Sequence, residues 1–251
     1  MPDELSYTIV SEAEAYPYDL REDAFVFAGG ATRPFDAGLT GDRTAVLAIG
    51  SNGAPQRLAR KFGEDAVVPV LPARLRDHAV VYAAAVTTYG SVPATLVEAP
   101  GATALVALTF LDDAQLAIMN TTEHVGRNYD LVHLPGPFEV DEAATVGEVL
   151  AYRSRYGPLR VDDQPVRLAE VPTVGTRFGA AYQSGMLALL HHHFAAPGEI
   201  YAGFVGDLVA SSTRREDIMA VMAEGVERRA SAALRWGKRP KRRITSRCRS
   251  A

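Results

Sequence analysis

Cysteine and long hydrophobic runs are almost missing from this sequence. The chain of 251 residues has one cysteine, Cys248, which excludes a disulfide framework and a zinc site built from cysteines. No apolar run approaches the roughly 20 residues that a membrane-spanning helix needs. The first 20 residues are acidic and lack the basic start and apolar core of a signal peptide. We therefore expect a cytoplasmic protein with no membrane partner.

Basic residues are scarce outside the C-terminal end. The net charge is −4, but residues 226–251 hold ten Lys or Arg against one acid, which leaves 16 basic and 29 acidic residues elsewhere. A flexible polybasic arm can neutralise the phosphates of a nucleic acid. No aromatic or groove-reading pattern accompanies this charge. We therefore interpret 226–251 as a solvated basic tail and do not expect a nucleic-acid partner.

Short strand-like segments fill the centre of the chain, and helix-like segments follow them. A buried strand is predicted at 44–50 and another strand at 24–30. Pro100-Gly101 is predicted as a turn between two strands. Further strand patterns lie at 67–75, 78–86, 93–99 and 103–111. Strands followed by helices indicate an α+β fold.

Local signals place several helices. Pro55 suits the first turn of a helix whose buried side carries Leu58 and Phe62. Asp112 or Asp113 can cap a short helix. The apolar repeat of 178–194 predicts a later helix, and Thr213 with Glu216 resembles a capping box that opens a helix over 215–234.

We expect three parts along the chain. Residues 1–43 form an N-terminal extension, 44–225 form the main domain with a helical elaboration at its C-terminal side, and 226–251 form the basic tail.

The buried strand 44–50 stops abruptly on Gly50-Ser51-Asn52-Gly53, just before the helix that Pro55 opens. A glycine lets backbone N–H groups approach a ligand closely. Those groups, together with a helix N-terminus, form an anion site. We therefore expect a small anionic substrate at this loop. The alternative is an ordinary turn between a strand and a helix.

Three segments, in order, resemble the γ-glutamyl cyclotransferase superfamily. The segment LAIGSN (47–52) resembles the family's Tyr-Gly-Ser-Asn loop, and 73–111 resembles its Ala-Arg-Leu stretch with the strands that follow. The segment LDDAQLAIMNTTEH (111–124) resembles the helix that ends in a Leu-Asp-x-x-Glu-Gly signature. The resemblance covers about 45–134. It implies a compact mixed β-barrel with flanking helices, and an enzyme that needs no cofactor or metal.

The resemblance also implies an activity and a set of site residues. In the family, a γ-glutamyl amine or amide cyclises to 5-oxoproline and releases the amine. Glu123 falls on the acid/base residue, and Tyr129 falls near a tyrosine that lines the family's pocket. The loop that holds the γ-glutamyl group corresponds to Ile49, Gly50, Ser51 and Asn52.

The chemistry explains why a carboxylate is needed. The substrate's α-amine arrives as an ammonium and must lose a proton before it attacks the γ-carbonyl. A partly buried carboxylate can take that proton and deliver one to the leaving amine. Holding the chain folded can lower the barrier by roughly 7–11 kcal/mol. One carboxylate can serve both steps, so Glu123 suffices.

Three positions depart from the family pattern. Ile49 replaces the loop tyrosine, while Asn120 and His124 replace the aspartate and the glycine of the third motif. Two alternatives therefore stay open on the same fold. One is decarboxylation of an N-carboxyurea-type compound, and the other is a non-catalytic module that binds a small anion.

Two other patterns resemble a metal site and a serine-hydrolase site, but their residues do not fit either. The side chains of His191, His192 and His193 point about 100° apart on a helix and cannot converge on one metal ion. A Gly-x-Ser-x-Gly nucleophile around Ser51 requires glycine at position 49, which is isoleucine. We expect no metal site and no serine-hydrolase site.

Overall fold

The computed structural model describes residues 4–134, 138–140, 145–146 and 148–226. The helices of this part are α1 (Glu4–Glu14), α2 (Pro55–Phe62), α3 (Asp113–Thr122), α4 (Gln183–Phe194), α5 (Tyr201–Ala210) and α6 (Ser212–Glu224), with 3₁₀ turns η1 (Ala37–Leu39) and η2 (Ser51–Gly53). Its strands are β1 (Phe25–Ala28), β2 (Ala31–Pro34), β3 (Thr44–Ala48), β4 (Val68–Tyr82), β5 (Ala94–Leu111), β6 (Tyr129–Leu134), β7 (Phe138–Val140), β8 (Thr145–Val146), β9 (Val149–Ser154), β10 (Arg160–Val161), β11 (Gln164–Pro165), β12 (Arg167–Leu168), β13 (Thr173–Val174) and β14 (Ala180–Ala181).

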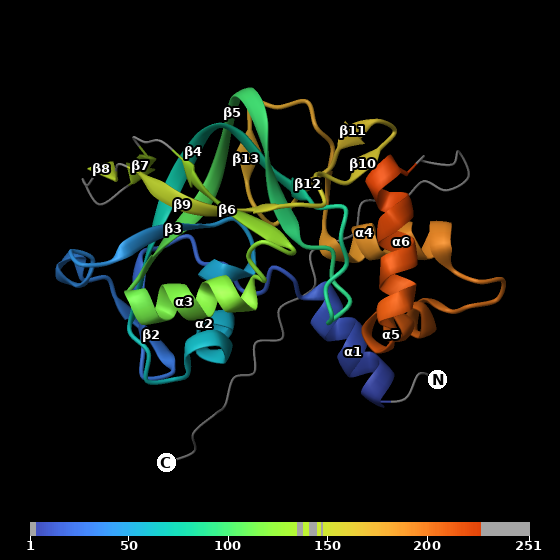
Figure 1. Cartoon of the computed structure of the whole chain (residues 1–251), viewed down its shortest axis with the longest axis horizontal. Coiled ribbons are helices and arrows are strands. Elements are labelled where there is room, and N and C mark those ends of the chain that lie inside the picture. The colour runs from blue at the N-terminus through green and yellow to red at the C-terminus, as the bar shows by residue number, and fades with distance from the viewer. Residues whose placement is uncertain (1–3, 135–137, 141–144, 147, 227–251) are drawn as a thin grey trace, which may run out of the picture.

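One large mixed sheet organises the molecule (Figure 1). Its main path runs β14-β12-β4-β5-β3-β9-β6. The pairs β3–β9 and β12–β14 are parallel, whereas β4–β5 and β3–β5 are antiparallel. Among the described strands, β14 and β6 at the two ends of this path are not paired with each other. The expected α+β class, a mixed sheet with flanking helices, is confirmed.

Strand β3 lies inside the sheet and leads to the Gly50-Ser51-Asn52-Gly53 loop. It pairs with β5 on one side and with β9 on the other. Val46 packs in the core beside α2 and α3, whereas Leu47 packs in the core on the opposite face. A strand buried on both faces is apolar throughout, which explains the continuous apolar run of this segment.

The longest strands, β4 and β5, correct one prediction. Pro100-Gly101 does not reverse the chain, because β5 continues through it and both of its halves pair with β4. The register shifts between Arg76 and His78, where Asp77 adopts a φ of 57° and Gly101 a φ of 81°. The Asp77 carboxylate accepts a hydrogen bond from the Gly101 N–H at 2.8 Å. The turn residues therefore make an irregularity in a continuous ladder.

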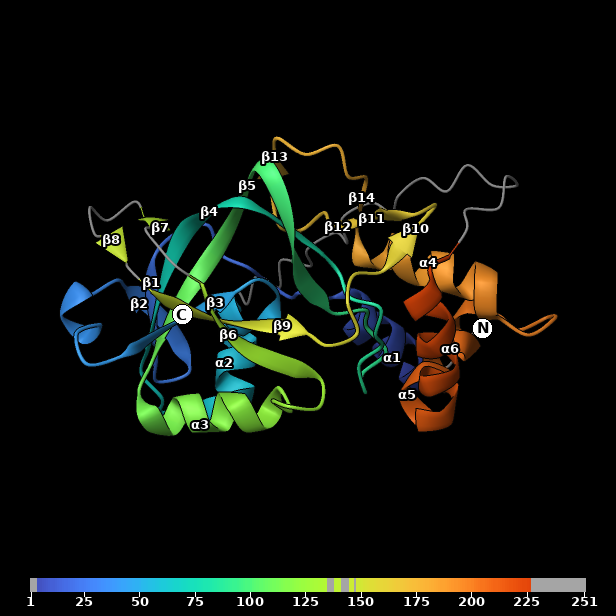
Figure 2. The same ribbon diagram turned by 45° about the horizontal axis from the view of Figure 1, so that its top comes forward.

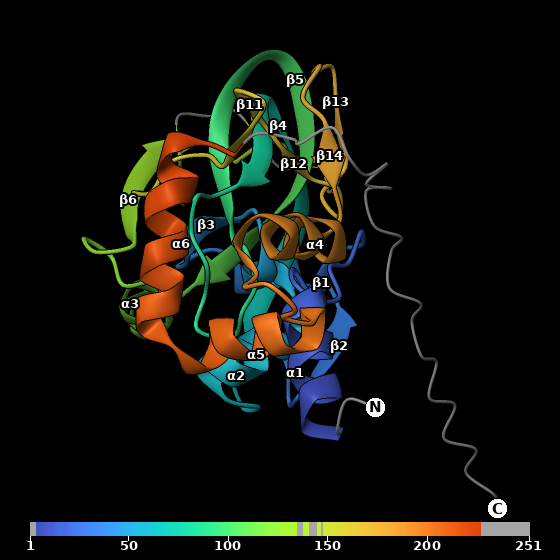
Figure 3. The same ribbon diagram turned by 90° about the vertical axis from the view of Figure 1, so that its right-hand side faces the viewer.

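The helices form two groups. Helices α2 and α3 lie together on one side of the molecule, and α1, α4, α5 and α6 gather on the other (Figures 1 and 2). In Figure 3, α4, α5 and α6 are seen in front of the sheet. The prediction for α2 is confirmed, with Pro55 in its first turn and Leu58 fully buried. Asp112 caps α3 through a capping box with Gln115.

The start of α6 differs from its prediction. The cap is Ser211, whose hydroxyl accepts a hydrogen bond from the Arg214 N–H at 3.1 Å, and the helix ends at Glu224 before Gly225. Thr213 already lies inside the helix. The residue three positions after Ser211 is Arg214, so Ser211 does not fit the capping-box pattern. Thr213 with Glu216 does fit it, which is why the pattern placed the cap two residues too late.

The first 43 residues contribute strands to the large sheet. Strand β1 pairs with both β2 and β4, and Phe25 and Phe27 are buried in the core. Helix α1 contacts α5. Apart from Val226, the basic tail 226–251 lies outside the described residues. No helix in the described part is long and apolar enough to cross a membrane.

Candidate functional site

The loop after β3 owes its glycine to a neighbour from the N-terminal segment. Gly50 has a φ of −142°, which other residues also adopt. A Cβ at this position would lie 2.2 Å from the Tyr16 hydroxyl, far inside van der Waals contact. That hydroxyl accepts a hydrogen bond from the Ala94 N–H at 2.8 Å. Close packing against Tyr16 is therefore sufficient to require glycine at position 50, whatever the loop binds.

Beyond Gly50, the loop winds into a 3₁₀ turn over Ser51–Gly53 and then into α2. Ser51 is buried, and Ala54 caps the helix without a side-chain hydrogen bond. The first N–H groups of a helical segment lack partners within it. The loop therefore presents backbone donors of the kind that hold anions.

Glu123 lies at the end of α3 that faces this loop. It is the C-cap residue, with φ −84° and ψ −3°, and His124 follows with a φ of 50° that redirects the chain toward β6. Helices α2 and α3 contact each other, so side chains of α2 reach Glu123. The Glu123 side chain is 15% exposed and the Lys61 side chain is 5% exposed.

Two donors converge on one oxygen of Glu123. Lys61 Nζ forms an ion pair with Oε1, and Asn52 Nδ2 donates to the same atom at 3.1 Å. Lys61 also donates to Thr122 Oγ1 at 2.9 Å and contacts Met119 Sδ at 3.1 Å. The C-terminal end of a helix carries partial negative charge, which is unfavourable for a carboxylate. Lys61 and Asn52 offset that cost.

The burial of Lys61 affects its proton. Desolvation lowers the pKa of the Lys61 ammonium, and the Glu123 charge opposes that change. The lysine therefore releases a proton at a lower pH than an exposed lysine does.

A small cavity of about 210 Å³ joins these residues. Drug-sized ligands fill pockets of roughly 300–1,000 Å³, so this one suits a smaller molecule. The structure places all six predicted site residues around it: Ile49, Gly50, Ser51, Asn52, Glu123 and Tyr129. Two segments distant in the sequence, 49–52 and 123–129, therefore meet at one place. None of this assigns a role to any of the six.

Tyrosines form much of the remaining wall. Tyr129 packs edge-on against Tyr152, with ring centroids 6.5 Å apart. The Tyr152 hydroxyl donates to Asn120 Oδ1 at 2.7 Å, so Asn120 fixes that ring. Burial raises the pKa of both hydroxyls, and the charge of Glu123 raises it further. These tyrosines are neutral hydrogen-bonding groups at physiological pH.

Several lining residues were not predicted from the sequence. Tyr16 precedes the loop by more than 30 residues, and Tyr89 lies between the strand patterns predicted at 78–86 and 93–99. Arg57 also lines the cavity, and Lys61 lies one helical turn further along α2. Their spacing of four residues places both cations on one face of α2, and that signal was visible in the sequence.

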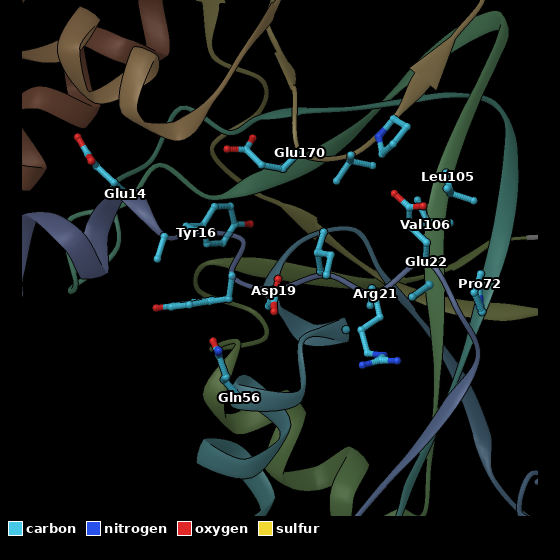
Figure 4. A pocket seen from close by; sticks show the side chains of 18 residues that line it. Glu14, Tyr16, Asp19, Arg21, Glu22, Gln56, Pro72, Leu105, Val106 and Glu170 are labelled. Carbon is cyan, nitrogen blue, oxygen red and sulfur yellow. The ribbon is translucent and has the colours of Figure 1, made fainter. Parts of the chain in front are cut away.

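A second and larger cavity, of about 380 Å³, lies on the other side of Tyr16. Figure 4 shows its side chains, which come from the N-terminal segment, from α2, from β4 and β5, and from the stretch around Glu170. Four carboxylates and one arginine line it: Glu14, Asp19, Glu22, Glu170 and Arg21. Glu123 does not line this larger cavity, and the four carboxylates that do line it disfavour an anion.

No group of His, Cys, Asp and Glu within the described part of the chain could hold a metal ion. His191 instead packs edge-on against Tyr201 and Phe204, and its Nε2 lies 2.9 Å from the Glu199 carbonyl oxygen.

Comparison with known proteins adds a likeness of fold. No family model matches the sequence, and no curated protein matches it. A solved structure described as gamma-glutamyl cyclotransferase is similar, with a TM-score of 0.41 and 15% identity over 71% of this chain and 98% of that one. A structure of an uncharacterized protein from Homo sapiens is similar too, with a TM-score of 0.42 and 15% identity over 72% and 99%. Both likenesses concern the fold alone.

Proposed function

We propose that this protein converts a γ-glutamyl amine or amide into 5-oxoproline and the free amine in the 210 Å³ cavity. The observation that carries the proposal is the position of Glu123. Its carboxylate is held by Lys61 and Asn52 at the wall of a cavity that also contains the Gly50–Asn52 loop. The site thus offers a base and an anion-binding loop within one small space.

The reaction is an intramolecular aminolysis. The α-amine nitrogen attacks the γ-carbonyl carbon, a ring C–N bond forms, and the C–N bond to the leaving amine breaks. Glu123 takes a proton from the attacking nitrogen and delivers a proton to the leaving nitrogen, so protons balance without a cofactor. Folding the substrate into this cavity supplies the proximity that favours ring closure.

Lys61 has a supporting role in this proposal. Its ammonium forms an ion pair with the Glu123 carboxylate and so holds that side chain in place. Asn52 fixes the carboxylate through its amide N–H. Both residues therefore orient the base.

The loop serves the carbonyl oxygen. Negative charge develops on this oxygen as the amine attacks, and backbone N–H groups aimed at it stabilise the transition state. Ile49 replaces the hydroxyl-bearing residue of the resembling family, so these backbone groups carry the task here. Tyr16 and Tyr152, which are both buried, form part of the apolar wall around this loop.

The test is to incubate the purified protein with a panel of γ-glutamyl amines and dipeptides and to assay 5-oxoproline. Wild type should form 5-oxoproline, Glu123→Gln should not, and Glu98→Gln, at an exposed position outside both cavities, should behave as wild type. Release of carbon dioxide from an N-carboxyurea-type compound, without 5-oxoproline, would replace the proposal with decarboxylation. Ligand binding without turnover would indicate a binding module.

A further inference from the structure

We infer that Arg57 binds the α-carboxylate of the substrate and makes the site selective for γ-glutamyl compounds over analogues that lack this group. The inference rests on the proposed function and names the ligand group that the cavity recognises. Arg57 would be a residue that determines specificity, because it contacts a part of the substrate that does not react.

The charge balance of the cavity supports a negatively charged ligand group. Lys61 is paired with Glu123, which leaves Arg57 as an additional positive charge at the wall. Within the described part of the chain, no carboxylate forms an ion pair with Arg57. The group of Arg57, Lys61 and Glu123, of which Arg57 and Glu123 line the cavity, carries a net charge of +1, which a single carboxylate would balance.

The guanidinium of Arg57 is held in place by two aromatic rings. Its Cζ lies 5.5 Å from the centroid of the Tyr18 ring and 5.0 Å from that of the Tyr89 ring. Cation–π contacts of this kind restrict an arginine without using up its charge. A planar guanidinium that is already positioned binds a carboxylate with two parallel hydrogen bonds. Arg57 is therefore organised for a ligand before one arrives.

Unused polar atoms belong to two side chains of this wall. Arg57 Nε is a buried donor and Asn52 Oδ1 a buried acceptor, and neither has a hydrogen-bond partner in the described structure. Buried polar groups are normally paired, so each such atom calls for an explanation. The α-carbon of a γ-glutamyl group carries an ammonium and a carboxylate together. The ammonium can donate near Asn52 and Glu123 while the carboxylate accepts from Arg57.

The experiment compares two substrates that share one leaving amine. The first is the γ-glutamyl amide, and the second is the 4-aminobutanoyl amide, which lacks the α-carboxylate and cyclises to 2-pyrrolidinone. We expect wild type to prefer the first in kcat/KM. Arg57→Met should lower kcat/KM for the first by roughly 10- to 100-fold, the size of a hydrogen bond to a charged group. It should change kcat/KM for the second substrate by no more than about threefold, so the preference for the first substrate should disappear.

Arg60→Met is the matched control, because Arg60 lies on the same helix, is exposed and pairs with Glu12 outside the cavity. It should leave the preference unchanged. Should Arg57→Met not fold, Arg57→Gln takes its place and is judged by the same ratio. Equal losses for both substrates would overturn the inference, as would a wild-type enzyme that does not discriminate between them.

A binding measurement separates this inference from the proposed reaction. In calorimetric titrations, wild type should bind 5-oxoproline, which carries the carboxylate, more tightly than neutral 2-pyrrolidinone. Arg57→Met should lose that difference. This result would support carboxylate recognition even if no substrate turned over. Equal affinity of wild type for both compounds, or no binding of 5-oxoproline, would refute it.

Discussion

Two cavities of opposite electrostatic character share one wall in this protein. The 210 Å³ cavity is lined by Arg57 and by Glu123, which forms an ion pair with Lys61, whereas the 380 Å³ cavity is lined by four carboxylates and one arginine. Tyr16 lines both, and its hydroxyl packs against Gly50. The larger cavity offers more room, but the smaller one offers the chemistry. Volume alone would therefore direct attention to the wrong place for an anionic substrate.

Coulomb's law gives the size of the electrostatic difference between the two cavities. Two unit charges 4 Å apart interact by about 4 kcal/mol at an effective dielectric of 20. An anionic ligand gains such an attraction beside Arg57 and meets repulsion beside the carboxylates of the larger cavity, such as Glu14 and Glu170. This sign difference is why we propose the smaller cavity as the substrate site, and four predictions test the two cavities and the wall between them.

The largest effect should come from removing the base. Glu123→Gln should lower kcat/KM for a γ-glutamyl amine by roughly 10²- to 10⁴-fold, the usual contribution of general acid–base catalysis. Glu22→Gln, the same change at an exposed position of the larger cavity, should leave kcat/KM near that of wild type. Initial rates of 5-oxoproline formation measure both. A comparable loss in the Glu22 variant would contradict the assignment.

The shared wall should be sensitive to one added methyl group. Gly50→Ala brings a Cβ against the Tyr16 hydroxyl and should destabilise the protein by about 1–3 kcal/mol, as overpacking does. Adding Tyr16→Phe removes the clashing oxygen and should recover part of that loss. Gly41→Ala, with open space around the new Cβ, is the control. Denaturant unfolding gives the free energy of unfolding of each variant. A denaturant midpoint of Gly50→Ala equal to that of wild type would show that Tyr16 can move aside.

The pH profile should report on Lys61. Its pKa is lowered by burial, so the ammonium is present at low pH and becomes neutral as pH rises through that lowered value. Loss of the ion pair with Glu123 should then reduce kcat/KM. This fall should begin at a lower pH than the pH at which an ordinary lysine loses its proton. Lys61→Arg keeps its charge at that pH and should move this alkaline limb upward. Identical profiles, measured on one substrate, would argue against the supporting role.

The smallest effect should come from a tyrosine hydroxyl. Tyr129→Phe keeps the ring that packs on Tyr152 and removes one hydrogen-bonding group. A typical hydrogen bond contributes about 0.5–1.5 kcal/mol, so kcat/KM should fall by roughly 2- to 13-fold. Tyr7→Phe, at an exposed position on α1, should have no effect. A loss as large as that of Glu123→Gln would instead make Tyr129 part of the chemistry.

Local signals predicted the parts of the site that lie close together in the sequence. The transition from β3 through Gly50 into α2 follows from an apolar run, a glycine-rich turn and Pro55 at a helix start. The capping of α3 by Asp112, and hence the place of Glu123 near its end, follows from local patterns as well. These features depend on neighbours within a few residues, which is the range that such patterns describe.

The remainder depends on packing between distant segments. Nothing near Tyr16 indicates that its ring will meet Gly50, and nothing near Tyr89 indicates that it will lie under Arg57. Pro100-Gly101 carries a strong turn signal, yet the long partner strand β4 keeps β5 extended through it. Such outcomes follow from the three-dimensional neighbours of a residue, which periodicity and spacing along the chain do not specify.

The most direct test is a crystal structure of the protein with the expected product, 5-oxoproline. The account predicts the ligand in the 210 Å³ cavity, with its ring beside the Gly50–Asn52 loop and Glu123, and its carboxylate on Arg57. Density for the ligand in the acidic 380 Å³ cavity, or no density in either at a saturating concentration, would contradict the assignment of the site.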